Sequence, residues 1–252
     1  MSLNSTNIKA MVLAAGLGTR LRPLTQTTPK ALLLVNGLPL ITYSLRLLKK
    51  HNVRDVLINL HHLGGLIEKE LGNGKKFGLK ISYSYEPQVL GTGGGIKKGR
   101  SFFGNGPFLI INSDILIDIN LTEFLRFHRK KKGIATMVVR PREADSQYTP
   151  ITKGRNDRIL HIGKNDQEAD QKRKVQSVSF TGVQMLEPAF LDFIPDQREA
   201  CVIREGYFPA LEAGKKVFGF LYEGYWNDLG TLDRLRQAEH DLVSRKTTLS
   251  YL

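Results

Sequence analysis

Cysteine and long apolar runs are both scarce in this 252-residue chain. Cys201 is the only cysteine, so the chain forms no internal disulfide and no metal site built from several thiolates. No stretch approaches the roughly 20 apolar residues that a membrane-spanning helix needs. Residues 1–9 are polar where a secretion signal has an apolar centre. We therefore expect a cytoplasmic protein that does not interact with membranes.

Acidic residues are also few, with 24 Asp and Glu against 37 Lys and Arg, which gives a net charge of +13. Such a charge suits either nucleic acids or small anionic substrates. The basic residues are dispersed, however, and no aromatic residues alternate with them as a base-stacking surface requires. We therefore expect small anionic substrates and no nucleic acid as partners.

The length of the chain favours one large α/β domain over two independent ones. No hexapeptide repeat follows Thr231, so a β-helical extension is not expected. We predict a single domain over residues 1–252, present as a monomer or a small homo-oligomer.

The segment over residues 11–30, MVLAAGLGTRLRPLTQTTPK, places a glycine turn directly after an apolar strand. Residues 8–15 are typical of a buried strand, so the turn falls at the sheet edge where ligands bind in α/β proteins. Gly16 and Gly18 lack a Cβ, which lets backbone N–H groups point at an anion. Three cations follow in the same segment: Arg20, Arg22 and Lys30.

Two well-known phosphate-binding motifs do not fit this turn. The dinucleotide fingerprint needs a third glycine that opens a helix, whereas Gly18 is followed by Thr-Arg-Leu-Arg-Pro. The Walker A motif needs Gly-Lys-Ser or Gly-Lys-Thr, and neither follows the turn. A tight turn without a ligand stays open as the simple alternative, but the cations favour a loop that holds a polyphosphate.

The blocks LAAGLGTRLRPLT and PK resemble the signature of the sugar-1-phosphate nucleotidyltransferases, also called nucleotide-sugar pyrophosphorylases. Further blocks in the family's order extend the resemblance over nearly the whole chain: EPQVLGTGGGI, INSD, FTGV, EGYFPAL and YWNDLGT. They look most like those of mannose-1-phosphate guanylyltransferases, followed by heptose-1-phosphate guanylyltransferases and N-acetylmuramate-1-phosphate uridylyltransferases. The resemblance implies transfer of a nucleotidyl group from a nucleoside triphosphate to a sugar 1-phosphate, with release of pyrophosphate.

In this resemblance, Arg20 and Lys30 are the catalytic cations that neutralise charge on the triphosphate. Glu86 matches a position that contacts the base. An ionised carboxylate only accepts hydrogen bonds, so Glu86 favours guanine, which offers two adjacent donors; a surface residue at a strand end is the alternative. The expected nucleotide-binding residues are Leu13, Ala15, Gly16, Gly18, Thr19, Glu86, Gly91 and Thr92.

Two aspartates are expected to bind the cofactor, Mg²⁺. Asp114 follows the apolar run over residues 108–111, where it either caps a helix or meets a ligand. In the resemblance, Asp114 and Asp228 match a pair that binds a divalent cation. Mg²⁺ prefers carboxylate, phosphate and water oxygens, so two aspartates without His or Cys suit it.

The FTGV block over residues 180–183 resembles a strand that lines a sugar pocket. Gly182 leaves room there for a sugar ring to pack against the backbone. Lys164 matches a lysine that touches the sugar phosphate, although Ile162 and Gly163 stand where acidic residues usually precede it; an ordinary surface lysine is the alternative. The expected sugar-phosphate-binding residues are Lys164, Thr181 and Gly182.

Apolar periodicity predicts alternating strands and helices first, and mostly strands later. Strands are expected at residues 8–15, 53–60, 79–85, 107–111, 134–140, 148–152, 158–163, 175–186 and 216–221, and helices at 38–51, 63–71, 92–103, 121–131, 201–213 and 231–245. The polar stretch 164–174 is typical of an exposed loop. We predict an α/β fold: a three-layer sandwich around a Rossmann-like mixed sheet. Its nucleotide-binding half covers about residues 1–140, and a small antiparallel sugar-binding part lies within about 141–252.

The chemistry needs no protein nucleophile, because a phosphate oxygen is already anionic at neutral pH and alignment with charge neutralisation is enough. Our first choice of substrates is GTP with mannose 1-phosphate. N-acetylmuramate 1-phosphate with UTP and heptose 1-phosphate with GTP are the enzymatic alternatives. A regulatory subunit that senses nucleotide sugars is the non-enzymatic alternative. Such a subunit would be expected to lack at least one of four residues, and all four are present: Arg20, Lys30, Asp114 and Asp228.

Overall fold

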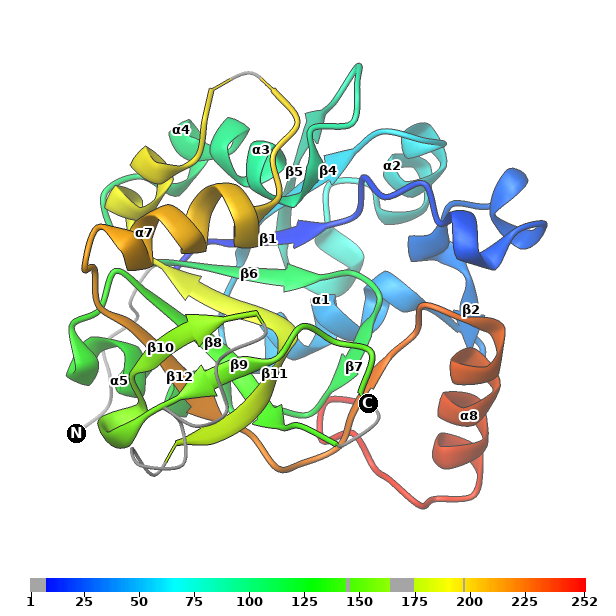
Figure 1. The fold of residues 1–252 in the computed structure, drawn as a ribbon. Helices are drawn as coiled ribbons and strands as arrows, with labels where there is room; N and C mark the ends of the chain where they lie inside the picture. The colour runs from blue at the N-terminus through cyan, green and yellow to red at the C-terminus, as the bar shows by residue number, and fades with distance from the viewer. Residues whose placement is uncertain (1–7, 144–145, 164–174, 197) are drawn as a thin grey trace.

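The computed structural model describes residues 8–143, 146–163, 175–196 and 198–252. Its main strands are β1 (Ala10–Leu13), β4 (Asp55–Leu60), β5 (Lys80–Tyr85), β6 (Phe108–Asn112), β8 (Ala135–Pro141), β9 (Ile151–Lys153), β10 (Ile159–Ile162), β11 (Gln176–Leu186) and β12 (Val217–Leu221). They form a nine-stranded sheet in the order β10-β9-β11-β6-β1-β4-β5, in which β8 pairs with β11 and β12 (Figure 1).

The direction of the strands changes along the sheet. β1 pairs in parallel with β4 and β6, and β4 pairs in parallel with β5. β11 is antiparallel to β6, β8 and β9, and β10 is antiparallel to β9. The mixed sheet is therefore parallel in the predicted nucleotide half and mainly antiparallel in the other, and it runs through both halves without interruption.

Helices cover both faces of this sheet. α1 (Leu40–Lys50), α2 (Gly64–Leu71) and α5 (Leu121–Lys131) lie on one face, and α3 (Gly91–Lys98), α4 (Arg100–Phe103) and α7 (Phe208–Glu212) on the other. The pleat of β1 divides its side chains accordingly: Val12 packs in the core with α1, and Met11 packs in the core with α3 and α7. The predicted three-layer α/β sandwich is confirmed.

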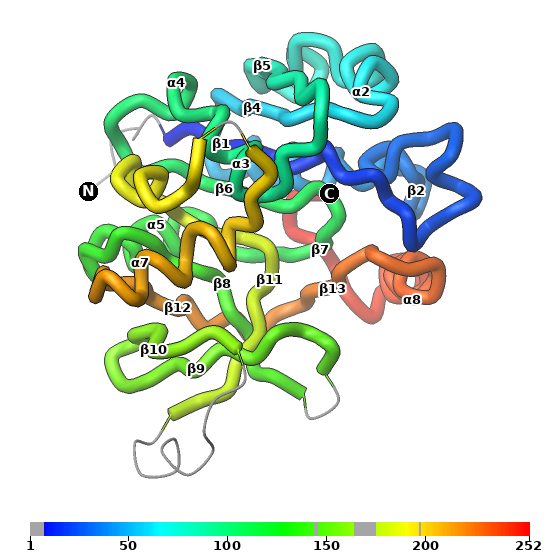
Figure 2. The backbone as a smooth tube through the Cα atoms, turned by 45° about the horizontal axis from the view of Figure 1, so that its top comes forward, coloured from blue at the N-terminus to red at the C-terminus, as the bar shows by residue number. Residues whose placement is uncertain are grey.

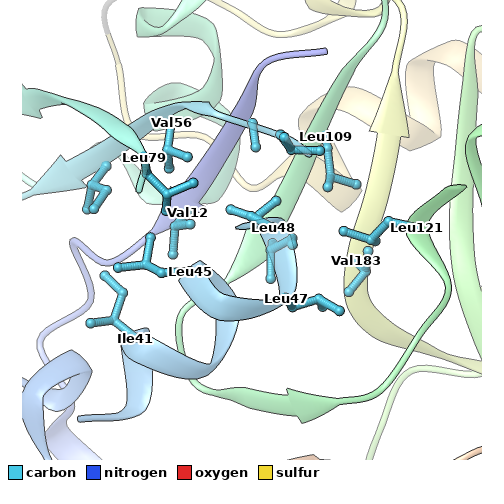
Figure 3. Packing of buried hydrophobic residues seen from close by; sticks show 14 of the residues in the cluster. Val12, Ile41, Leu45, Leu47, Leu48, Val56, Leu79, Leu109, Leu121 and Val183 are labelled. Atoms are coloured by element: carbon cyan, nitrogen blue, oxygen red, sulfur yellow. The ribbon is translucent and has the colours of Figure 1, made fainter. Parts of the chain in front are cut away.

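The core between α1 and the sheet is built from aliphatic side chains (Figure 3). Leu45 and Leu48 of α1 are fully buried against Val12 and its neighbours. Burial of one such side chain stabilises a fold by about 1.5–3 kcal/mol. This packing fixes the end of β1, after which the loop over residues 16–30 begins. We name this loop, which is predicted to bind phosphate, the phosphate loop.

Two short sheets lie beside the main one. β2 (Leu34–Val35) pairs with β3 (Leu38–Pro39), and β7 (Ile115–Ile117) pairs with β13 (Trp226–Asp228). α8 (Leu232–Val243) packs near both, and Figure 2 shows it at the opposite side of the molecule from α7. In the same view β9, β10 and the start of β11 extend away from the helical layers.

Three predicted helices differ from the structure, each at a proline or a glycine. The helix predicted over 38–51 begins only at Leu40, because Leu38–Pro39 form β3. The helix predicted over 92–103 is broken at Gly99 into α3 and α4. The helix predicted over 201–213 is continuous over residues 202–212, but it contains a π-helical turn, Ile203–Tyr207, that runs into α7. Pro209 has no N–H to donate within the helix, and the regular α-helical hydrogen bonds are interrupted just before it. The predicted loop at 164–174 lies outside the described residues.

Candidate active site

A cleft of about 200 Å³ opens at the carboxyl ends of β1, β4 and β6. Leu13 lies in register with Asn59 on one side and with Asn112 on the other, so three neighbouring strands end together at its floor. Ligands bind at this edge of parallel sheets. Eight residues predicted from the sequence line the cleft: Leu13, Ala15, Gly16, Lys30, Glu86, Gly91, Thr92 and Asp114.

Glu86 lies in the wall of the cleft and is 3% exposed, so it is not a surface residue. Its Oε1 accepts a hydrogen bond of 2.7 Å from Asn59 Nδ2, and its Oε2 accepts one of 3.0 Å from the backbone N–H of Leu90. Asn59 Oδ1 in turn accepts a hydrogen bond of 2.8 Å from the N–H of Ala14. The carboxylate thus ties together the ends of β1, β4 and β5.

The glycines at the start of α3 make room for protein as well as for a ligand. A Cβ on Gly91 would lie 2.6 Å from the carbonyl oxygen of Ala200, and a Cβ on Gly94 would lie 2.6 Å from that of Arg198. The N–H of Gly93 donates to Ala200 O at 2.7 Å, and Thr92 Oγ1 accepts from the N–H of Val202 at 3.0 Å. Residues 198–202 therefore pack directly on the glycine-rich turn.

The phosphate loop after β1 folds into short 3-10 turns. Gly18 has φ +63°, in the left-handed region that favours glycine. A Cβ there would also lie only 2.8 Å from Thr25 Cγ2, so a larger residue would clash. Thr25 Oγ1 donates to Gly18 O at 2.8 Å and closes the loop. Thr19 and Arg20 begin the first turn, at Thr19–Leu21, and do not line the cleft itself.

The predicted cations lie beside the predicted carboxylates. Lys30 forms an ion pair with Asp114 Oδ2 in the cleft wall. A Cβ on Gly230 would lie 2.9 Å from Arg20 Nη2 and 2.9 Å from Asp228 Oδ1, so this guanidinium and this carboxylate both flank Gly230. Lys30 and Arg20 thus each lie near one of the two aspartates.

The two aspartates come from adjacent segments although they are far apart in sequence. β13 pairs with β7 so that Asp228 stands opposite Ile115, and the N–H of Leu229 donates to Asp114 O at 2.8 Å. Their oxygens, with phosphate and water, form a donor set that fits Mg²⁺. Within the described ranges, no three His, Cys, Asp or Glu side chains cluster as a protein-only metal cage.

Asp228 also contacts two residues that the sequence did not single out. Its Oδ2 accepts hydrogen bonds from Tyr148 Oη at 2.8 Å and from Arg234 Nη1 at 3.0 Å. Burial, and secondly the hydrogen bond to Asp228, raise the pKa of Tyr148 to about 12, so the phenol stays protonated and donates. Arg234 also donates to Tyr148 Oη, at 2.5 Å.

The predicted sugar-binding strand carries an irregularity at the predicted place. The register between β11 and β8 shifts between Phe180 and Gln184, and Gly182 there has φ +90°. A Cβ on Gly182 would lie 2.8 Å from Nδ2 of Asn112, which lines the cleft. Thr181 is buried and donates to Val138 O at 2.9 Å, so its hydroxyl supports the strand. Lys164 lies outside the described residues.

Sequence reasoning missed four residues at this site: Asn59, Asn112, Tyr148 and Arg234. The sequence could have indicated Asn59 and Asn112, because each is a polar residue near the end of a mainly apolar strand. Tyr148 and Arg234 had no such signal, since their partner Asp228 is 80 and 6 residues away along the chain.

Comparison with known proteins agrees with this geometry. Residues 9–245 match the sequence profile of the Nucleotidyl transferase family. The chain belongs to this family. The resemblance inferred from the sequence blocks is thereby confirmed, and the cleft lies where the family's signature segment meets the sheet edge.

Individual relatives carry different substrate names. The chain is 32% identical to a UTP–glucose-1-phosphate uridylyltransferase of Synechocystis over 95% of this chain and 64% of the relative. It is 32% identical to a mannose-1-phosphate guanylyltransferase of Mycobacterium tuberculosis over 94% of this chain and 65% of the relative. It is 34% identical to an N-acetylmuramate alpha-1-phosphate uridylyltransferase of Neisseria meningitidis over 92% of this chain and 97% of the relative. The chain thus spans slightly less than two thirds of the first two relatives.

Solved structures share the fold. An apo UDP-glucose pyrophosphorylase superposes with a TM-score of 0.76 at 20% identity, over 95% of this chain and 100% of that one. HddC from Yersinia pseudotuberculosis, complexed with GMP-PN, superposes with a TM-score of 0.76 at 18% identity, over 93% and 99% of the two chains. In the part of the chain that the structure describes, no helix has both the length and the apolar character to cross a membrane.

Proposed function

We propose that this protein transfers a nucleotidyl group from a nucleoside triphosphate to a sugar 1-phosphate and releases pyrophosphate. One observation carries the proposal: in a chain of the Nucleotidyl transferase family, Lys30 of the phosphate loop reaches Asp114 in the wall of the cleft. A lysine and a carboxylate at the same sheet edge can together hold a triphosphate, the lysine directly and the carboxylate through a divalent cation.

The chain's own residues supply binding and alignment. The sugar phosphate oxygen attacks the α-phosphorus in line, and the bond to the leaving pyrophosphate breaks. Lys30 holds the reacting phosphates in the cleft, and Arg20, beside Gly230, neutralises charge on the departing pyrophosphate. Asp114 and Asp228 would hold Mg²⁺, which supplies charge neutralisation at the α-phosphate when bound.

The choice of nucleobase is a finer question. The sequence favours GTP through Glu86, but in the structure both oxygens of this carboxylate accept hydrogen bonds from the protein. Each oxygen can accept more than one hydrogen bond, so Glu86 keeps acceptor capacity for a base in the cleft. The M. tuberculosis relative also carries a guanylyltransferase name. GTP with mannose 1-phosphate stays one candidate pair.

UTP with N-acetylmuramate 1-phosphate is the second candidate pair. It is favoured by the N. meningitidis relative, which matches this chain over nearly the full length of both proteins. The two candidates share the cleft, the cations and the aspartates, and differ in the base and in the acceptor sugar. One panel of assays separates them.

The test is pyrophosphate release by the purified chain with Mg²⁺, four triphosphates and several sugar 1-phosphates, including those of mannose, glucose, heptose and N-acetylmuramate. The proposal expects release only when a triphosphate and a sugar 1-phosphate are present together. Release with no pair in the panel would contradict a transferase and favour a sensing subunit. Omission of the sugar phosphate is the control for simple triphosphate hydrolysis.

A further inference from the structure

A second cavity of about 310 Å³, which we name the arginine pocket, is lined by Tyr148 and Arg234, the two residues that donate to Asp228. Its lining is mainly polar and includes Arg140, Glu143, Ser146, Tyr148, Ser179 and Arg234. The phosphate-binding cleft described above shares none of these residues. The arginine pocket is therefore lined by a different set of side chains from the cleft.

The arginine pocket adjoins the predicted sugar-binding strand through Trp226. The indole N–H of Trp226 donates to Thr181 O at 2.8 Å. The guanidinium of Arg140 lies 5.0 Å from the centre of the indole ring, and the ring of Tyr148 meets it edge-on at 5.4 Å. Trp226 thus links the predicted sugar-binding strand to two residues that line the arginine pocket, Arg140 and Tyr148.

Ser179 is the observation that points to a ligand in this pocket. The side chain is 2% exposed and lines the pocket, yet its Oγ has no hydrogen-bond partner among the residues that the structure describes. Buried hydroxyl groups are nearly always hydrogen-bonded, because an unpaired one has lost its water without replacement. An acceptor inside the pocket would satisfy this hydroxyl.

The charges in the pocket favour an anionic acceptor. Arg140 pairs at 3.3 Å with Glu143, whose side chain is 77% exposed, and such exposed pairs are weak. Arg234 donates from Nη1 to Asp228 and Tyr148. Gln147 Oε1 accepts from Nη1 of Arg234 at 3.2 Å and from its Nη2 at 2.5 Å, which leaves the Nε–H and one N–H of Nη2. A guanidinium carries five N–H donors in a fork that matches a carboxylate, so both arginines keep donors for a ligand.

We propose that the arginine pocket binds a carboxylate carried by the acceptor sugar. This inference rests on the proposed function and names its substrate class: a sugar 1-phosphate with an acidic substituent away from the anomeric carbon. The anomeric phosphate itself must reach Lys30 in the cleft, so it does not fill this pocket. A neutral hexose would supply no anion for Ser179 and for the remaining donors of Arg140 and Arg234.

The test compares two acceptors that differ by one group. N-acetylmuramate 1-phosphate is N-acetylglucosamine 1-phosphate with a lactyl ether, which carries a carboxylate. Calorimetric affinities of the full chain for both are measured, so that the result does not depend on turnover. We expect the carboxylated sugar to bind at least about 10-fold more tightly, as a charge-assisted hydrogen-bonding site predicts.

Substitutions in the arginine pocket test whether it causes the preference for the carboxylated sugar. Ser179→Ala and Arg140→Gln should each lower the ratio of the two affinities by about 10-fold. Arg158→Gln is the matched control, because Arg158 also stacks on an aromatic ring, Phe218 at 5.8 Å, but lies outside the pocket. Equal or undetectable affinities for the two sugars, or a ratio unchanged in both pocket variants, would overturn the inference. Failure of every triphosphate to react would instead overturn the proposed function.

Discussion

Asn59 donates a hydrogen bond of 2.7 Å to Glu86, and the other oxygen of this carboxylate accepts from the N–H of Leu90. The ends of β1, β4 and β5 and the start of α3 are thus joined through one buried side chain. These hydrogen bonds favour a positioning role for Glu86, and its direct contact with the base stays a prediction.

Replacement of Glu86 separates these two roles. Glu86→Gln places an amide N–H against one of the two protein donors, so one hydrogen bond to a charged acceptor is lost. We expect KM to rise by about 10-fold for every triphosphate, with the ratio of GTP to UTP kept within about twofold. Steady-state kinetics with both nucleotides measure this. A rise of KM for GTP alone would instead support direct contact between Glu86 and the base. Asn59→Leu is the companion variant, and we expect it to raise KM equally for both nucleotides.

Arg20 provides a test of the phosphate loop. Its guanidinium flanks Gly230 opposite Asp228, where it can neutralise the charge of the leaving pyrophosphate. Arg20→Ala is expected to lower kcat by about 10²–10³-fold, by analogy with the loss of one oxyanion donor. Arg236→Ala is the matched control, because Arg236 is 79% exposed on α8. Equal kcat values for the two variants would contradict the role of Arg20.

Gly94 tests the contact between α3 and residues 198–202. A Cβ at this position would lie 2.6 Å from the carbonyl oxygen of Arg198, so backbone must shift in Gly94→Ala. Overpacking of this kind costs about 1–3 kcal/mol, which lowers Tm by about 2–12 °C in a chain of this size. Gly106→Ala is the control, since no atom lies within 4 Å of the position of its Cβ. Thermal unfolding that does not distinguish the two variants would contradict the tight packing.

Burial of His128 should make the stability of the fold depend on pH. It is 1% exposed, with Nδ1 2.8 Å from Thr136 Oγ1 and Nε2 3.2 Å from Glu187 Oε1. Burial lowers the pKa of His128 below its usual 6.5 despite the opposing effect of Glu187. The fold therefore favours neutral imidazole: its stabilisation is complete above about pH 6.5 and is lost progressively as the pH falls towards the lowered pKa.

Urea unfolding at pH 7.5 and 5.5 measures this effect. The free energy of unfolding of the wild type should fall more between these two pH values than that of His128→Gln, which keeps a polar side chain but does not titrate. A wild-type protein that gains stability at pH 5.5 relative to the variant would show that the ion pair with Glu187 outweighs burial.

The fold was predictable because strand and helix periods are strong in this chain. Val12 and Met11 alternate between two cores as the strand pattern requires, and the α1 side chains Leu45 and Leu48 follow helical spacing. The differences arose where a local feature overrode the pattern: Gly99 interrupts one helix, and a π-helical turn precedes Pro209 in another. Apolar periodicity does not register such backbone constraints.

The candidate site was only partly predictable, because some of its contacts join residues that are far apart along the chain. Lys30, Gly18 and Asp114 stand in short motifs whose residue types already indicate phosphate or metal chemistry. Tyr148 and Arg234 acquire their place only through Asp228, in contacts that depend on the pairing of β13 with β7. Gly91 was expected to bind the nucleotide, and the packing of the α3 glycines against residues 198–202 depends on a segment more than 100 positions away.

We propose that Lys30, Asp114 and Asp228 together hold one triphosphate for attack by a sugar phosphate. Pyrophosphate release with Mg²⁺ by the wild type, by Lys30→Ala and by the exposed-lysine control Lys76→Ala tests this arrangement. We expect release by the wild type and the control only when both substrates are present, and a rate lower by about 10²–10³-fold in Lys30→Ala. Equal rates in Lys30→Ala and the control would show that Lys30 does not hold the reacting phosphates.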